Sequence, residues 1–357
     1  MNTLPPSAPR EPSPPGAPTS NVGYVLAKAG VAPPPEAAAR RPRPGGSARV
    51  ANFGVVLFLA ALVVVFSIWL PGKFPTWSNV QVILGDNAIP GLLALAVVVP
   101  LAAGEFDLSV GATLGFSAIL TAYLTIHGFP VPLAILAAIL TGAVIGAVNS
   151  FLVVRIGVNA FIATLGVATI LAGLNLLVSG GATLLGIPLA LEGVSQNALL
   201  GLPMPVWYFL GAALLLWYLL EHTPFGRLLR ATGLGREAAR LTGVSTKRFL
   251  ASSFIIAGAI AGLCGALQTG RIGSATASIG PEFLLPAYAA AFLGSTTIRR
   301  GMFNVWGTVI GVLILAVGIT GLTLAGAPFW VPDVFNGGAL ILAVSTAVLV
   351  GRHGGDT

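Results

Sequence analysis

The sequence predicts an all-α fold, a polytopic transmembrane helical bundle of about ten spans. Apolar residues make up 55% of the 357 residues and charged residues only 8%, whereas soluble domains carry about 25% charged residues. The mean hydropathy is +0.92. The few charges leave long uncharged runs between them, and such runs are typical of spanning helices. This composition excludes a soluble enzyme, a disordered protein, a fibre and a disulfide scaffold.

The uncharged runs divide into ten helical segments. A spanning helix needs roughly 20 apolar residues, and the uncharged run 108–154 is long enough for two, with a turn at His127–Pro130. The eighth segment is too short to cross alone, so we expect it to extend into its flanks. The predicted spans are 53–70, 88–103, 107–126, 131–153, 160–179, 205–220, 249–269, 284–294, 304–325 and 333–350.

The basic residues predict the orientation of the bundle. With the N-terminus inside, 16 of the 18 Lys and Arg residues fall on the inner side, and only Lys73 and Arg271 fall outside. The positive-inside rule therefore predicts a multi-pass membrane protein with both termini in the cytoplasm. The same asymmetry accounts for the net charge of +7 without any nucleic-acid partner.

Residues 1–48 form a separate predicted domain, a disordered Pro-rich cytoplasmic tail. They hold 12 of the 26 prolines and no apolar run of spanning length. Such a segment cannot bury enough apolar surface to offset its chain entropy. It also lacks the basic and apolar regions of a signal peptide. The remaining chain, 49–352, is predicted to be one transmembrane domain.

Glycine pairs at four-residue spacing predict where helices approach closely. The pairs are Gly111/Gly115, Gly142/Gly146, Gly258/Gly262 and Gly307/Gly311. Small residues allow close approach where lipid supplies no hydrophobic drive between helices. We expect these positions to be packing faces.

Nothing in the residues predicts catalysis, a cofactor or a metal site. No Gly-x-x-x-x-Gly-Lys-Ser/Thr phosphate loop is present. His127, His222 and His353 are far apart in the sequence, and Cys264 is the single cysteine. Because a metal site needs several such ligands close together, none is expected, and the chain is not expected to be an enzyme.

Glu105 and Asp107 lie between the second and third spans. Acidic groups at membrane depth are costly and are usually functional, so one interpretation is a polar or proton-coupling site in a pathway. The other is a hydrated cytoplasmic loop, or a carboxylate that caps the helix beginning near Leu108 and Ser109. The capping interpretation is favoured, and the sequence leaves both open.

Uncharged polar side chains within or beside the spans are further pathway candidates. Amides and hydroxyls can hydrogen-bond a neutral polyhydroxylated solute without the cost of burying charge. Each can equally bridge two helices. The candidates are Asn149, Asn159, Thr164, Asn175, Gln268, Asn304 and Asn336.

The loop 221–248 carries six basic residues. Arg236 to Leu241 are good helix formers, and Gly243 can end a helix. A short helix here would present an apolar knob ringed by charge, which suits a cytoplasmic docking contact. Alternatively, the basic residues only fix the orientation. The knob and its ring would be Ala238, Ala239, Leu241, Arg236 and Arg240.

Four blocks in this order resemble bacterial ABC importer permeases of the ribose-type sugar and branched-chain amino acid family. The first is Gly104-Glu105-Phe106-Asp107-Leu108-Ser109-Val110-Gly111, which is similar to the family's Gly-Gly-Ile-Asp-Leu-Ser-Val-Gly signature. The second is Asn149 followed by 161–166, and the third is the loop 221–248. The fourth is 294–297 with Gly301, Gly307 and Gly311. The resemblance covers about residues 53–350.

The resemblance implies a type II importer-like permease of a bacterial inner membrane, which works with two cytoplasmic ATPase subunits and an extracytoplasmic solute-binding protein. It would pair with a second permease chain as a homodimer or a pseudo-dimer, of which the homodimer is favoured. ATP would be hydrolysed on the ATPase subunit. The pathway would lie at the dimer interface and carry a monosaccharide or similar polyol. Alternatives are a permease for branched-chain amino acids or nucleosides, or an ion-coupled secondary transporter that uses Glu105 and Asp107.

The resemblance also assigns site residues. The ATPase-coupling residues of the loop 221–248 would be Arg236, Glu237, Ala238, Ala239 and Gly243. The pathway or signature-loop residues would be Glu105, Asp107, Ser109, Asn149, Asn159, Thr164 and Asn304. Three features depart from the family pattern and bear on the substrate more than on the mechanism. They are Glu105 and Ser295 at glycine positions, and Arg299-Arg300 where the family is often Gly-rich.

Overall fold

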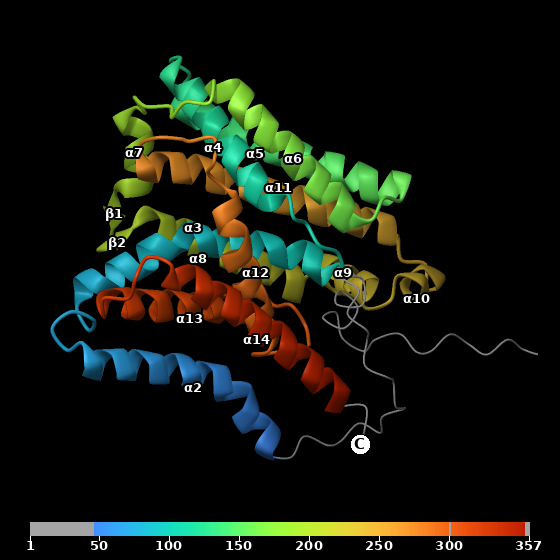
Figure 1. Ribbon diagram of the computed structural model, residues 1–357. Coiled ribbons are helices and arrows are strands. Elements are labelled where there is room, and N and C mark those ends of the chain that lie inside the picture. Colours follow the sequence, from blue (N-terminus) through green and yellow to red (C-terminus); the bar gives the residue numbers. More distant parts are fainter. Residues whose placement is uncertain (1–45, 300, 354–357) are drawn as a thin grey trace, which may run out of the picture.

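The structure is a computed structural model that describes residues 46–299 and 301–353, with the side chains of 54–299 and 301–345. Most of the predicted tail 1–48 lies outside the described residues, and its last three positions begin helix α2. The described chain is a bundle of helices with one short hairpin (Figure 1).

Helices and short π-helical extensions follow one another along the chain, with loops of a few residues between most of them. In order, the elements are α2 (Gly46–Trp69), α3 (Trp77–Ala102), α4 (Val110–Ile126), α5 (Val131–Ser150), η1 (Phe151–Ile156), α6 (Ala160–Ser179), α7 (Leu189–Gln196), β1 (Ala198–Leu199), β2 (Leu202–Pro203), α8 (Met204–Trp217), η2 (Tyr218–His222), α9 (Pro224–Leu234), α10 (Arg236–Leu241), α11 (Thr246–Ile272), α12 (Pro281–Ser295), α13 (Val305–Leu324) and α14 (Val331–His353).

A helix lies on each of the ten predicted segments. The bounds of α6 match the prediction to the residue, and α12 extends beyond 284–294 as expected. The second segment differs most, because α3 begins at Trp77 rather than at 88; the Thr76 hydroxyl accepts a hydrogen bond from the Asn79 amide and caps the earlier start. The fold is therefore all-α and polytopic.

Six helical stretches of the described chain are long and apolar enough to cross a membrane. They are Trp77–Ala102, Val131–Ile156, Ala160–Ser179, Met204–His222, Thr246–Ile272 and Val305–Leu324. Shorter apolar stretches are Gly54–Trp69 of α2, α4 with 17 residues, and Val331–Ser345 of α14, whereas α12 has 15 residues.

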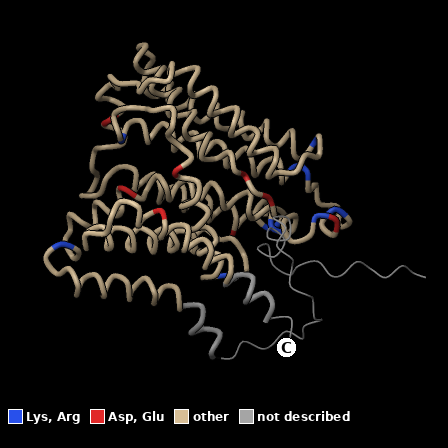
Figure 2. The backbone as a smooth tube through the Cα atoms, in the orientation of Figure 1, with Lys and Arg blue, Asp and Glu red and all other residues tan. Residues whose placement is uncertain are grey.

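Charge distinguishes the two ends of the bundle. Most of the basic positions in Figure 2 gather where α9 and α10 lie, whereas the loop between α2 and α3 carries a basic residue at the opposite end. We call the end of the bundle that holds α9 and α10 the basic end. The opposite end, which holds β1 and β2, is the hairpin end. Helix α2 begins and α14 ends at the basic end (Figure 1).

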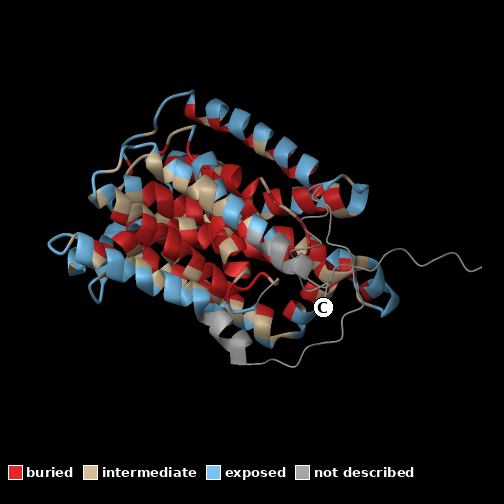
Figure 3. Ribbon diagram, turned by 60° about the horizontal axis from the view of Figure 1, so that its bottom comes forward, coloured by how far each residue is buried: buried red, intermediate tan, exposed pale blue. Residues whose placement is uncertain are grey.

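The core lies around α3, and the perimeter is apolar. Residues 91–105 are all buried, and Figure 3 shows buried positions in the middle of the bundle with exposed positions around them. Large apolar side chains such as Ile68, Leu177 and Leu215 are 76%, 75% and 68% exposed. This arrangement suits a protein whose sides face lipid.

The predicted glycine contacts are confirmed. A Cβ added to Gly142 of α5 would lie 2.1 Å from the carbonyl oxygen of Gly258 on α11, and one added to Gly146 would lie 2.2 Å from that of Phe254. A Cβ at Gly115 would lie 2.1 Å from the Ile279 carbonyl oxygen, and one at Gly311 would lie 2.3 Å from that of Ala290. At these points α5 touches α11, α13 touches α12, and α4 touches the loop before α12, in each case backbone to backbone.

We predict that Gly142→Ala destabilises the bundle by about 1–3 kcal/mol, because the added methyl group overlaps the α11 backbone. The buried thiol of Cys264 on α11 reports unfolding: its reaction with a thiol-reactive fluorophore should begin at a lower temperature in the variant. The matched control is Gly173→Ala on α6, where a Cβ meets nothing within 4 Å. Equal unfolding temperatures for the two variants would contradict the packing argument.

Candidate functional site

The segment between α3 and α4, residues 103–109, turns back into the protein rather than out to solvent. Gly104 has φ of +80°, which favours glycine, and the Glu105 amide donates to the Pro100 carbonyl at 2.9 Å. Glu105, Asp107 and Ser109 are each 1% exposed. The interpretation of a hydrated loop is therefore wrong, because the loop is covered by other helices.

Four of the predicted site residues meet in one hydrogen-bonded network. Asp107 Oδ1 accepts from the Ser109 amide at 3.0 Å and from Ser109 Oγ at 2.6 Å, so the carboxylate holds the residue that directly precedes α4. Asn149 Nδ2 of α5 donates to Ser109 Oγ at 2.7 Å. The Leu108 amide donates to Thr164 Oγ1 of α6 at 3.1 Å. The loop thus joins α4, α5 and α6.

Tyr288 of α12 is a member of this network that the sequence analysis missed. Its hydroxyl donates to the Asp107 carbonyl at 2.9 Å and accepts from the Asp107 amide at 3.0 Å. Phe106 packs against the Tyr288 ring and against Phe292, with ring centroids 5.9 Å and 6.4 Å apart. A tyrosine in an apolar helix needs a partner for its hydroxyl, and that need is the signal that could have identified it.

Asn159 and Asn304 do not join the network. Asn159 Oδ1 accepts from the Phe161 amide at 2.9 Å and caps α6. Asn304 Oδ1 accepts from the Gly307 amide at 2.7 Å and caps α13. Both amides are engaged in starting a helix at the basic end.

The short helix predicted over Arg236 to Leu241 is confirmed as α10, and Gly243 follows it with φ of +86°. Leu241 is 84% exposed, and Ala238 is exposed as well. Ala239 was expected on the same surface, but it is 6% exposed, because α10 packs this face against α9 and α11. The exposed apolar knob is therefore Ala238 and Leu241 alone.

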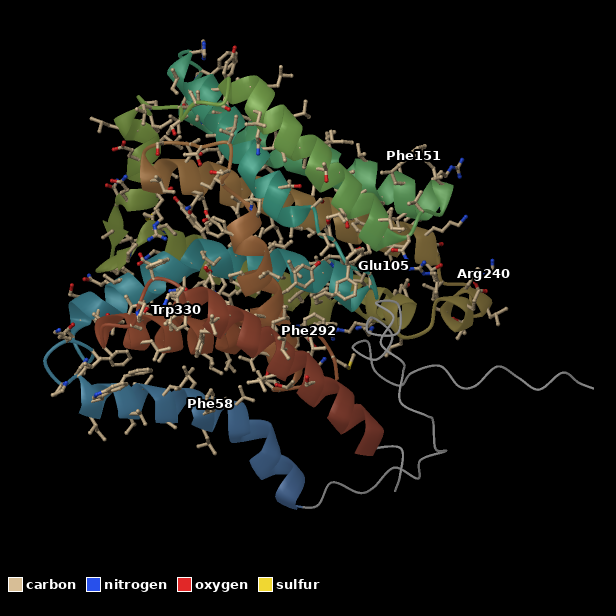
Figure 4. The ribbon with its side chains drawn as sticks, in the orientation of Figure 1. Phe58, Glu105, Phe151, Arg240, Phe292 and Trp330 are labelled. Carbon is tan, nitrogen blue, oxygen red and sulfur yellow. The ribbon has the colours of Figure 1, made fainter. Side chains whose placement is uncertain are left out.

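An ion pair connects α10 to the buried loop. Arg236 Nη2 lies 2.6 Å from Glu105 Oε1, and the Glu105 side chain is 2% exposed. Figure 4 shows Glu105 beside α9 at the basic end, with Arg240 farther out on α10. Gly233 of α9 abuts the end of α3, where an added Cβ would lie 2.3 Å from the Ala102 carbonyl oxygen. The acidic residue that departs from the family signature thus fastens α10 to the loop.

A second cluster of charges reinforces the same end. Glu221 of η2 pairs with Arg230 of α9 and with Arg299, which follows α12. Glu221 and Arg230 side chains are each 9% exposed. Buried charges of this kind need their partners, so the cluster holds α9 in place relative to the neighbouring helices.

Comparison with known proteins shows which family the chain resembles in sequence. Residues 79–344 match the family model described as "branched-chain amino acid transport system / permease component". The D-allose transport system permease protein AlsC of Escherichia coli strain K12 is 31% identical over 302 residues, covering 84% of this chain and 93% of that protein. No solved structure matches.

Two further relatives are permeases of the autoinducer 2 import system. LsrD of Salmonella typhimurium strain LT2 is 32% identical over 306 residues, covering 83% of this chain and 92% of that protein. LsrD of Escherichia coli strain K12 / DH10B is 33% identical over 302 residues, covering 82% and 92%. The chain therefore belongs to the ABC importer permease family of the ribose-type sugar and branched-chain amino acid systems, as a permease subunit whose ATPase is a separate chain.

Proposed function

We propose that this chain carries a monosaccharide or a similar polyol into a bacterial cell, receiving it from an extracytoplasmic binding protein and using a cytoplasmic ATPase. The relatives named for D-allose and for autoinducer 2 support a solute of this class. Branched-chain amino acids or nucleosides are the second possibility within the family. An ion-coupled carrier has less support, because Glu105 is paired with Arg236 and holds α10.

The proposed topology has ten membrane crossings with the basic end and both termini in the cytoplasm, and two copies of the chain pair as a homodimer. The ten crossings are supported by the helix that lies on each predicted segment. The orientation is supported by the basic residues that gather around α9 and α10 (Figure 2). Among the residues whose side chains are described, six helical stretches are long and apolar enough to cross on their own. Helices α4 and α12 are shorter and would cross together with the turns that flank them.

The observation that carries the proposal is the exposed apolar knob on α10, held by a buried ion pair. Leu241 is 84% exposed although it is a large apolar residue beside charged neighbours. The Glu237–Arg240 pair, 2.9 Å apart, stands next to it in solvent. An apolar centre with a charged rim is typical of a docking contact. The ATPase would bind here, with Arg236, Glu237, Ala238 and Gly243 around Leu241, while the buried Ala239 packs beneath the contact.

We also propose that the Asp107 network borders the solute pathway. Asp107 Oδ2 and Asn149 Oδ1 are buried without a hydrogen-bond partner among the described residues. Buried polar atoms are otherwise almost always satisfied. A passing hydroxyl or a water molecule would supply the missing donor.

The first test is mild-detergent affinity purification of the chain from its native membranes, followed by mass spectrometry and an ATPase assay. A stoichiometric ATPase subunit is expected to co-elute. Uptake of D-allose, D-ribose, D-galactose and L-leucine by the reconstituted system would then identify the solute class. Recovery of the chain alone, with uptake driven by an ion gradient in liposomes, would contradict the proposal.

We predict that Leu241→Asp and Glu237→Lys each reduce ATPase capture and uptake at least about tenfold, because the first replaces the apolar anchor with a charge and the second reverses a charge of the rim. The bundle should still fold, since neither side chain is buried. The control is Leu189→Asp on α7 at the hairpin end, where an 82% exposed leucine receives the same charge. ATPase capture by the α10 variants that equals the control would refute docking at α10.

The Glu105–Arg236 pair yields a second prediction, measured by a double-mutant cycle. Glu105→Gln or Arg236→Gln alone should lower the free energy of unfolding by about 1–3 kcal/mol. This is less than the roughly 3–5 kcal/mol lost when one partner of a fully buried ion pair is removed, because Arg236 is partly exposed. Removing both charges together should cost less than the sum of the two single changes. Cys264 labelling on heating measures stability, and additive effects would show that the pair contributes nothing.

A further inference from the structure

Three basic residues lie at the basic end of the bundle, where η1 meets the start of α11. They are Arg155 of η1 and Lys247 and Arg248 of α11, and all three side chains are exposed. None of the three forms an ion pair or a side-chain hydrogen bond with another residue that the structure describes. We call these three residues the η1–α11 patch.

The packing of α5 against α11 brings the patch together. The two helices run antiparallel, and Gly142 of α5 meets Gly258 of α11. Four residues later on α5, Gly146 meets Phe254, which lies four residues earlier on α11. Continuing this register past the end of α5 places η1 beside the first turn of α11, and the two elements are in contact. Arg155 therefore lies beside the turn that carries the other two cations.

The charge of the patch is not balanced by acidic side chains among the described residues. At the basic end, Glu105, Glu221 and Glu237 are each paired with arginines outside the patch, and Asp107 is buried. The first turn of α11 has no acidic residue either. Because the positive end of the helix dipole lies there, the cations of α11 stand in an unfavourable field that a bound anion would relieve.

An exposed apolar stripe runs along α5 and ends next to the patch. It consists of Leu140, Val144, Val148 and Phe151, all of which are exposed. Figure 4 shows Phe151 on the outside of the bundle. The stripe belongs to the stretch Val131–Ile156, which is long and apolar enough to cross a membrane. Its exposed face would therefore contact acyl chains, and the patch would lie at the level of the lipid headgroups.

We infer that the η1–α11 patch binds the phosphate group of an anionic phospholipid from the cytoplasmic leaflet, with an acyl chain along the exposed stripe of α5. Basic residues beside a spanning helix on the cytoplasmic side attract anionic headgroups. A zwitterionic headgroup fits less well, because its ammonium group would meet only cations in the patch. The inference rests on the proposed topology, which puts the basic end in the cytoplasm.

The test is native mass spectrometry of the full-length chain, purified in detergent with its bound subunits and titrated with palmitoyl-oleoyl phosphatidylglycerol or phosphatidylcholine. Phosphatidylglycerol should bind more tightly than phosphatidylcholine, which has the same chains but no net charge. Because each cation near the headgroup strengthens the attraction, Arg155→Gln and Lys247→Gln should each raise the dissociation constant for phosphatidylglycerol roughly fivefold. Equal affinities for the two lipids would overturn the site.

The matched control is Lys73→Gln, which removes the same charge at the hairpin end. Lys73 is exposed and forms no ion pair with a described residue, so this variant should leave the dissociation constant unchanged. If Lys73→Gln weakens binding as much as Lys247→Gln does, net charge alone attracts the lipid and the site is refuted. Loss of the ATPase from Lys247→Gln with unchanged lipid binding would assign the patch to the ATPase instead.

The side of the membrane is tested separately. In a Cys264→Ala background, Lys247→Cys should react with a membrane-impermeant maleimide in inverted membrane vesicles and not in right-side-out vesicles. The opposite result would overturn the proposed topology and, with it, the cytoplasmic leaflet as the source of the lipid. Equal lipid affinities together with the expected labelling would overturn the lipid site alone and leave the proposed function standing.

Discussion

The rest of the structure depends on the backbone contact between α5 and α11. In lipid, apolar surface gives helices no reason to associate, so close packing at small residues must supply the attraction. Gly142 and Gly146 meet the α11 backbone around Gly258 and Phe254 with no space for a side chain. Helix α11 is thereby held along its length. It follows α10 at the basic end, and at the hairpin end it carries Gln268 and Arg271, which line a cavity between α3, α11, α12, α13 and α14.

Helix α12 brings the two polar regions of the protein within a few turns of each other. One of its faces carries Phe283, Pro286 and Ala290 in the cavity wall. Another carries Tyr288, whose hydroxyl holds the backbone of Asp107. A shift of α12 would therefore move both the cavity wall and the buried loop. The loop in turn is tied through Glu105 to Arg236 of α10.

Charge at the basic end serves two purposes. In the proposed topology, basic residues on the surface set the orientation in the membrane. Two buried acids have a different role, because each is matched to an arginine from another segment: Glu105 to Arg236, and Glu221 to Arg230 and Arg299. These pairs hold α9 and α10 against the bundle while Leu241 remains outside. A docking element needs this combination of a firm base and an apolar tip.

The sequence by itself determined the helical segments, the short helix at Arg236 to Leu241 and the glycine contact faces, because hydropathy, propensity and small-residue spacing are local properties. It also determined the family, through the signature around Asp107 and the coupling loop. Only the tertiary structure decided that Tyr288 joins Asp107, that Glu105 meets Arg236, and that five helices leave a cavity around Gln268 and Asn336. These partners are far apart in the chain, and which of them meet depends on how the helices cross, which no local pattern records.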